Sequence, residues 1–130
     1  MILEKLELQD FGPFKSTSIE LSPPSTDRPV VVFGGLNGSG KTSILEAIQL
    51  CLYGKRARTQ KRKKLGYEDY LRRCIRTGAA EHEGASLRLT FSIRASGEDE
   101  SITIARDWHV NGSGIKEQRQ VLRNGSHDEN

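Results

Sequence analysis

The chain has 130 residues, 35% of them hydrophobic, so it is large enough for one domain with a core of its own. No apolar run approaches the roughly 20 residues that span a bilayer, and the acidic, alternating start MILEKLELQD has neither a signal-peptide nor a transit-peptide pattern, so we expect a soluble cytoplasmic protein with no membrane partner. The net charge of +3 includes seven basic residues and no acid between Lys55 and Lys64, so the remainder of the chain is acidic.

Two short strands are predicted near the N-terminus. Leu6 and Leu8 alternate with polar residues, as do Ile19 and Leu21, and the turn DFGPFK separates the two segments. The linker SPPSTDRP then breaks strand pairing, because proline has no backbone N–H to donate. The continuous apolar run from Val30 to Phe33 is typical of a central strand that is covered on both faces in a parallel α/β sheet.

Two helices are predicted next. The segment from Lys41 to Tyr53 is almost entirely apolar and should be largely buried, with Gly54 where a helix often ends. In the second, about residues 67–76, the apolar side chains recur at helical spacing, and Gly78 can end it. Acidic residues in its first turn and arginines in its last predict i,i+4 pairs of Glu68 with Arg72 and of Asp69 with Arg73. Cys51 and Cys74 fall on the apolar faces, which favours packed thiols over a zinc site.

The last third of the chain predicts an antiparallel β meander over about residues 86–123. Leu87, Leu89, Phe91 and Ile93 alternate with polar residues, and the same period resumes at Ile102 after the acidic turn SGEDE. A third strand, about residues 115–122, follows NGSG, and Asn124-Gly125 is a further turn. We expect Trp108 to pack in this meander.

A phosphate-binding motif lies between the first predicted helix and the strand before it. Residues 35–42, GLNGSGKT, match G-x-x-x-x-G-K-[ST], the P-loop. Glycines let backbone N–H groups converge on a phosphate, and the start of the following helix presents its unpaired N–H groups to the same anion. Lys41 is expected to bridge the β and γ phosphates of ATP, and Thr42 to place its hydroxyl on Mg²⁺. The predicted nucleotide-binding residues of this loop are Gly35, Asn37, Gly38, Ser39, Gly40, Lys41, Thr42 and Ser43.

Other interpretations of the motif remain open. A glycine-rich turn that only caps a helix would satisfy the same pattern, although the predicted strand before it and helix after it favour a true P-loop. A small nucleotide kinase would need a lid with arginines, which the tract from Lys55 to Lys64 could imitate, but the β meander argues against it. A GTPase is disfavoured because the chain has no N-K-x-D motif.

The stretches LQDFGPFK, FGGLNGSGKTSILEAIQLCLYGKRA and YEDYLRRCI, with the meander after them, resemble the N-terminal half of an SMC-like ABC ATPase head, the group that includes RecF-, RecN- and SbcC-type DNA ATPases. The resemblance covers essentially the whole chain. It implies an α/β fold: a P-loop NTPase, in the form of the N-terminal lobe of an ABC/SMC-type head with an antiparallel β meander.

The resemblance also implies partners and missing groups. In such heads the loop after the first strand covers the nucleotide, which would put Phe14 and Lys15 near adenine and phosphates; the alternative, a core aromatic and a solvated charge, is equally compatible with the sequence. The family needs an apolar strand ending in Asp-Glu, a serine-glycine signature loop and a switch histidine, and none occurs here. We therefore expect half of an ATPase head, which requires its C-terminal half and a second head to hydrolyse ATP, and an isolated chain that is nearly inactive and prone to association.

The basic tract has two interpretations of similar weight. It could contact DNA phosphates in a salt-sensitive, sequence-independent way, or it could be a solvated loop between two helices. No aromatic residue interleaves with it, so base stacking has no support. A further possibility is a DNA-binding module in which this tract matters most and the P-loop is only structural. The residues concerned are Lys55, Arg56, Arg58, Lys61, Arg62, Lys63 and Lys64.

Overall fold

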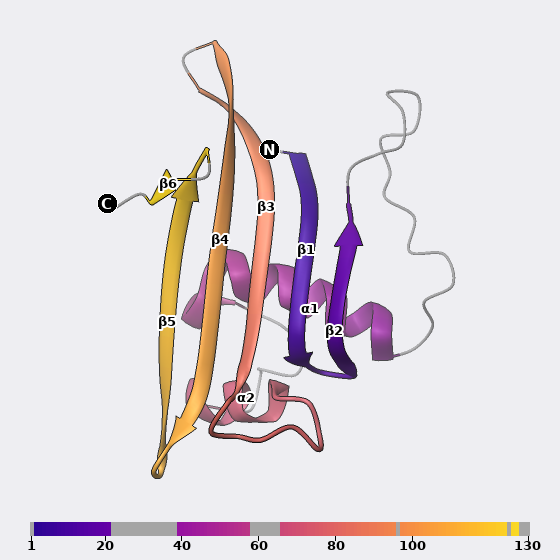
Figure 1. Ribbon diagram of the computed structural model, residues 1–130, viewed down its shortest axis with the longest axis vertical. Helices are drawn as coiled ribbons and strands as arrows, with labels where there is room; N and C mark the ends of the chain where they lie inside the picture. Colours follow the sequence, from indigo (N-terminus) through magenta and orange to yellow (C-terminus); the bar gives the residue numbers. More distant parts are fainter. Residues whose placement is uncertain (1, 22–38, 58–65, 96, 125, 128–130) are drawn as a thin grey trace.

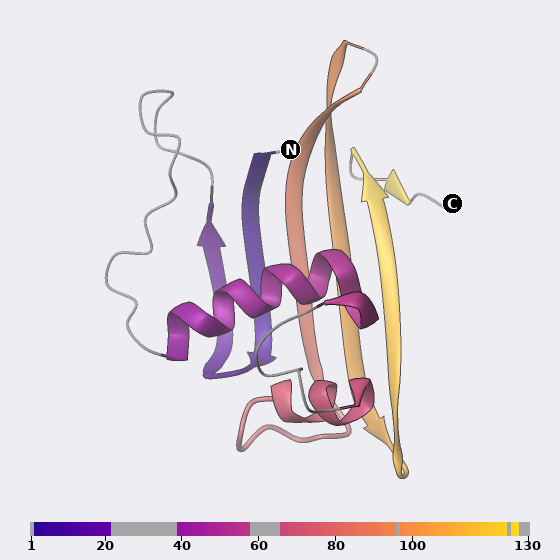
Figure 2. The same cartoon turned by 180° about the vertical axis from the view of Figure 1, so that it is seen from behind.

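The described part of the chain forms one antiparallel sheet with two α-helices on one of its faces. A computed structural model of the chain describes residues 2–21, 39–57, 66–95, 97–124 and 126–127. The six strands follow the order β2-β1-β3-β4-β5-β6, and both helices lie on the same face (Figures 1 and 2). The predicted linker and the predicted strand from Val30 to Phe33 lie outside the described residues.

The first hairpin forms as predicted. β1 (Ile2–Phe11) pairs antiparallel with β2 (Phe14–Glu20), with Leu6 opposite Ile19 and Leu8 opposite Thr17. The alternation places Leu6 and Leu8 on the buried face, where they are 0% and 2% exposed. The turn is tighter than the sequence indicates, because only Gly12, with φ of 55°, and Pro13 separate the strands.

The meander extends this hairpin into one sheet. β3 (Ala85–Ala95) pairs with both β1 and β4 (Glu98–Asn111), β4 pairs with β5 (Gly114–Arg123), and the short β6 (Ser126–His127) pairs with the end of β5. The predicted strand segments are confirmed, but β4 already begins at Glu98 within the expected acidic turn. Leu87, Leu89 and Phe91 point to the buried face, as the period of two requires.

The first predicted helix is confirmed as α1 (Ser39–Tyr53), followed by a 3-10 turn, η1 (Gly54–Arg56). It crosses the sheet from the β2 side towards β4 and β5 (Figure 2). Ile44, Ala47 and Leu50 are fully buried against the strands. The expectation of a largely buried helix is wrong for its outer side, since Leu45 is 47% and Tyr53 59% exposed.

The second helix, α2 (Tyr67–Cys74), ends two residues earlier than predicted. Ile75 turns to an extended conformation and forms a β-bridge with Phe11, and the backbone N–H of Arg76 donates to the carbonyl of Asp10 at 2.7 Å. The end of α2 is therefore set by pairing with β1 rather than by Gly78.

The predicted charge pairs along α2 are wrong. Glu68 accepts a hydrogen bond from the backbone N–H of Ile115 at 3.0 Å, and Arg72 donates to the carbonyl of Ser113, so both side chains reach the β4–β5 turn. Among the residues that the structure describes, no ion pair joins Asp69 to Arg73.

Trp108 is 1% exposed and packs within the meander, as predicted, and it also joins α2 to the sheet. Its indole Nε1 donates to the carbonyl of Leu71 at 2.8 Å, and its ring meets that of Phe11 edge to face at a centroid distance of 6.0 Å. Both cysteines are buried free thiols.

Candidate functional site

The predicted P-loop runs into the start of α1. Gly35, Asn37 and Gly38 lie outside the described residues, and for the span from Ser39 to Thr42 the structure describes the backbone, which forms the first turn of α1. That turn contains no acidic residue, so no carboxylate on it offsets the partial positive charge at the N-terminus of this 15-residue helix. A helix start of this kind fits a phosphate ligand, as the motif predicts.

The β1–β2 turn packs against α1 one residue after the motif. A Cβ atom added at Gly12 would lie 3.0 Å from Oγ of Ser43, which is itself 2% exposed. Phe14 and Lys15 follow this turn, and their place near a bound nucleotide, which the resemblance implies, stays a prediction. Phe14 is nevertheless half-buried against the core and Lys15 is exposed, which also fits the structural alternative. Phe11 is a core residue, 2% exposed.

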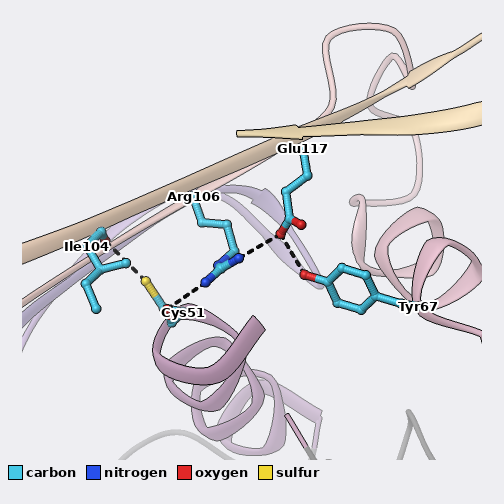
Figure 3. Close-up of polar contacts among 5 residues, drawn as sticks. All are labelled: Cys51, Tyr67, Ile104, Arg106 and Glu117. Atoms are coloured by element: carbon cyan, nitrogen blue, oxygen red, sulfur yellow. Dashed lines mark hydrogen bonds and ion pairs between the residues drawn. The ribbon is translucent and has the colours of Figure 1, made fainter. Parts of the chain in front are cut away.

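A buried arginine holds the other end of α1. The last turn of α1 carries no basic residue of its own; instead, Arg106 of β4 donates from Nη2 to the carbonyl of Cys51 at 3.3 Å. Its Nη1 donates to Oε2 of Glu117 at 3.0 Å, and the hydroxyl of Tyr67 donates to the same oxygen at 2.6 Å (Figure 3). A cation at a helix C-terminus is favourable because the carbonyl end carries partial negative charge.

This network perturbs two protonation equilibria. The pKa of Tyr67 is raised well above its ordinary value, mainly by burial and secondly by the hydrogen bond to the Glu117 carboxylate. Burial also raises the pKa of the Cys51 thiol from 9.0 to about 11, against the opposing influence of Arg106. The Cys51 sulfur donates to the carbonyl of Ile104 at 3.2 Å, so this thiol is a structural group and a poor nucleophile.

Described residues on both sides of the basic tract lie at this network. Lys55 and Arg56 are exposed in η1, while Arg58, Lys61, Arg62, Lys63 and Lys64 lie outside the described residues. Gly54 immediately precedes the tract, and a Cβ atom added there would lie 2.8 Å from Nη1 of Arg106; on the other side, Tyr67 binds Glu117. Both flanks of the tract are thus fixed to the sheet.

The sequence patterns described above do not indicate this network. Arg106 occupies an inward position of β4, in the series Ile102, Ile104, Arg106, Trp108, and a charge in such a series is the signal that could have revealed it. Glu46 on α1 is also buried, at 5% exposure, and no sequence pattern singles it out.

Other features of the described residues do not add a site. A hollow of about 590 Å³ lies over the polar face of the sheet, around Glu7, Gln9, Arg88 and Asp107, and includes no residue of α1. In the described ranges no group of three or more His, Cys, Asp or Glu side chains could hold a metal ion. Neither described helix has both the length and the apolar character needed for a membrane span.

Comparison with known proteins identifies related sequences. Residues 5–129 match a family model described as an AAA domain. The DNA double-strand break repair Rad50 ATPase of Archaeoglobus fulgidus is 30% identical over 126 residues, which cover 97% of this chain and 12% of that protein. The DNA replication and repair protein RecF of Limosilactobacillus fermentum is 32% identical over 99 residues, which cover 75% of this chain and 25% of RecF. The chain therefore spans a quarter or less of these relatives.

A solved structure shares the fold. It is described as "Structural biochemistry of ATP-driven dimerization and DNA stimulated activation of SMC ATPases", and superposes with a TM-score of 0.60 at 24% identity, covering 98% of this chain and 72% of that one. The architecture is that of the N-terminal lobe of an ABC/SMC-type head in the P-loop NTPase class.

Proposed function

Because the chain belongs to the AAA domain family and forms the N-terminal lobe of an SMC-like ABC ATPase head, we propose that it binds ATP-Mg²⁺ as part of a DNA-processing ATPase. The observation that carries the proposal is the coincidence of the motif at residues 35–42 with the start of α1 at Ser39. A glycine-rich loop that enters a long helix at this position is the context that the phosphate-binding motif requires.

The residues of the motif have distinct roles in this proposal. Backbone N–H groups of the loop and of the first turn of α1 bind phosphate oxygens, and Lys41 adds a point charge at the β and γ phosphates. The Thr42 hydroxyl is a ligand for Mg²⁺, which neutralises charge on the transferred phosphoryl group. Water activation needs acidic and signature residues that this sequence lacks, so hydrolysis is assigned to a head completed by its C-terminal half and paired with a second head.

We further propose a specific biological system for this ATPase. The segments FGGLNGSGKT and LYGKRA resemble those of DndD, the ATPase of bacterial DNA phosphorothioate modification. DNA would then be the substrate of the assembly, and other proteins of the modification system would be partners. The Rad50 and RecF relatives, which their names assign to DNA repair and replication, support the broader class of DNA ATPases.

Nucleotide binding by purified protein tests the proposal. ATP with Mg²⁺ should bind to the wild type, and Lys41→Ala should weaken binding at least tenfold, because it removes the cation at the β and γ phosphates. Lys55→Ala is the matched control, since it removes an exposed lysine at the far end of α1. Equal binding by wild type and Lys41→Ala would refute the assignment of the motif. Hydrolysis by the isolated chain that is lost in Lys41→Ala would refute its expected inactivity.

The alternative of a DNA-binding module makes the opposite prediction. Neutralising the basic tract would abolish salt-dependent DNA binding, while Lys41→Ala would leave it unchanged. DNA binding with this pattern, combined with no measurable ATP binding, would replace the nucleotide-binding proposal.

A further inference from the structure

The end of β1 and the segment that follows α2 are joined by contacts between residues far apart in the sequence. The backbone N–H of Arg76 donates to the carbonyl of Asp10 at 2.7 Å, and the N–H of Gly12 donates to the carbonyl of Cys74 at 2.8 Å. A β-bridge lies between these two bonds. The Arg76 side chain adds a further contact, from Nε to Oδ1 of Asp10 at 3.0 Å. We call this set of contacts the clip.

The clip coincides with an unusual backbone conformation at Asp10. Its φ of 49° lies in the left-handed region, although Asp10 belongs to the strand β1. The other described non-glycine residue with positive φ is Asn124, in the turn between β5 and β6, where such a conformation is common. A residue with a side chain keeps this conformation only where its surroundings determine it, and such residues gather at functional sites. At Asp10 this surrounding group is Arg76, which binds both its carbonyl and its carboxylate.

The clip sets the position of the β1–β2 turn relative to α1. Gly12 in this turn is bound to the end of α2 on one side, and on the other side an added Cβ would lie 3.0 Å from Oγ of Ser43. Ser43 directly follows Lys41 and Thr42 of the phosphate-binding motif and is 2% exposed. A shift of the turn towards α1 would therefore displace the residue that follows the motif.

Space beside the turn makes this anchoring necessary. A pocket of about 420 Å³ opens between the turn, α1 and α2, and its lining includes Gly12, Ser43 and Glu46. Side-chain packing against this side of the turn is therefore incomplete, so the hydrogen bonds of the clip have a larger part in fixing it. Binding sites need their geometry held to within about 0.5 Å by the residues around them.

We propose that Asp10 and Arg76 are positioning residues of the nucleotide site, which hold the β1–β2 turn against the start of α1 and couple nucleotide binding to the end of α2. The inference rests on the proposed nucleotide-binding function. Neither residue contacts the nucleotide; both act through Gly12 and Ser43. Because coupling between two equilibria is reciprocal, a clip that strengthens ATP binding must itself be stabilised by ATP, and by the same factor.

The alternative is an ion pair that only supports the fold. A second ion pair in the sheet allows the two roles to be separated, since Arg123 pairs with Glu100 at 3.4 Å. Glu100 lies opposite Ile93, at the end of β3 that is distant from the β1–β2 turn. Glu100→Gln is therefore the matched control, because it removes one carboxylate from an ion pair that cannot position this turn.

ATP affinity of paired variants tests the proposal. Calorimetry with ATP and Mg²⁺ would compare the wild type with Asp10→Asn, Arg76→Gln and the double variant. Asparagine tolerates the left-handed conformation, so Asp10→Asn removes the charge and keeps the backbone. Each single variant should weaken binding about three- to tenfold, and the double variant should bind no more weakly than Arg76→Gln, because the two residues act as one unit. Arg76→Lys keeps the charge and should stay within about twofold of the wild type.

Amide hydrogen exchange gives a readout that a purely structural role would not change. In the wild type, saturating ATP should slow exchange of the Gly12 amide, which the clip protects, by about the same factor by which Arg76→Gln weakens ATP binding. In Arg76→Gln the Gly12 amide should no longer respond to ATP. Glu100→Gln should keep both the wild-type affinity and the wild-type response.

The outcomes separate this inference from the proposed function. Circular dichroism would establish that each variant is folded, and if Arg76→Gln does not fold, the isosteric Asp10→Asn decides the same question. If ATP binds and depends on Lys41, but the clip variants keep the wild-type affinity or the Gly12 amide ignores ATP, the inference is wrong and the nucleotide-binding function stands. An equal loss of affinity in Glu100→Gln would also overturn it, since general destabilisation would then be the cause. If ATP does not bind at all, both are wrong.

Discussion

At the residue scale, the clearest requirement of the structure is at Gly54, where α1 ends. Its φ of 55° belongs to the left-handed region that favours glycine, and an added Cβ would lie 2.8 Å from Nη1 of Arg106. The same position therefore ends the helix and leaves space for the arginine that binds the carbonyl of Cys51. A residue with a side chain here would disturb the backbone and the buried ion pair together.

Gly54→Ala is expected to lower the free energy of unfolding by about 2–4 kcal/mol, the sum of left-handed strain and displacement of a buried guanidinium. Gly97→Ala is the control, because Gly97 has a similar φ of 81° but no atom within 4 Å of the added Cβ. That variant should lose only about 1 kcal/mol in urea denaturation. Equal losses in the two variants would show that Arg106 does not need the space at Gly54.

The Cys51 thiol predicts a pH dependence of stability. Its pKa is higher in the folded chain, at about 11, than the ordinary 9.0, so folding favours the protonated thiol. Its contribution is complete below pH 9 and is lost as the pH rises towards 11, because only the unfolded chain ionises in that window. Between pH 8 and pH 10 the free energy of unfolding should fall by about 1 kcal/mol more in the wild type than in Cys51→Ala. Parallel pH profiles for the two proteins would contradict this.

At the element scale, sequence periodicity predicted the strands well and the ends and contacts of the helices less well. The period of two predicts which side chains of β3 are buried, and these side chains, Leu87, Leu89 and Phe91, are buried. Both helices lie on one face of the sheet (Figure 2). The end of α2 depends instead on the bridge between Ile75 and Phe11, residues 64 positions apart, and no local pattern encodes such a pairing. For the same reason Glu68 and Arg72 bind the β4–β5 turn rather than each other.

The candidate site shows the same division between local and distant information. The phosphate-binding motif is contiguous, so its type and its place before a helix follow from sequence alone. Arg106, Glu117 and Tyr67 come from three elements, and their proximity results from the register that sets Arg106 opposite Arg119 and Trp108 opposite Glu117. The pocket at Glu46 likewise exists only because α2 and the β1–β2 turn meet α1.

At the scale of the whole molecule, α1 connects the candidate site to the rest of the chain. Its start carries the motif, its middle is tied to α2 by the Glu46–Tyr70 hydrogen bond, and its end is held by Arg106. A nucleotide bound at the first turn would therefore contact a helix that is anchored at two further points. The inner side of α1 packs against the sheet, and its outer side is exposed.

That outer side predicts how the isolated chain behaves in solution. Leu45 and Tyr53 are 47% and 59% exposed, and they lie two helical turns apart on the same face as the half-buried Ile48 and Leu52. Burying this apolar surface is favourable, so the chain should self-associate with increasing concentration in sedimentation experiments. Leu45→Gln with Tyr53→Gln should raise the monomer fraction several-fold and change the free energy of unfolding by less than about 1 kcal/mol, because neither side chain belongs to the core. Glu81→Gln, an exposed change away from α1, should leave the association unaltered. Undiminished association of the double variant would show that the outer side of α1 is not the contact surface.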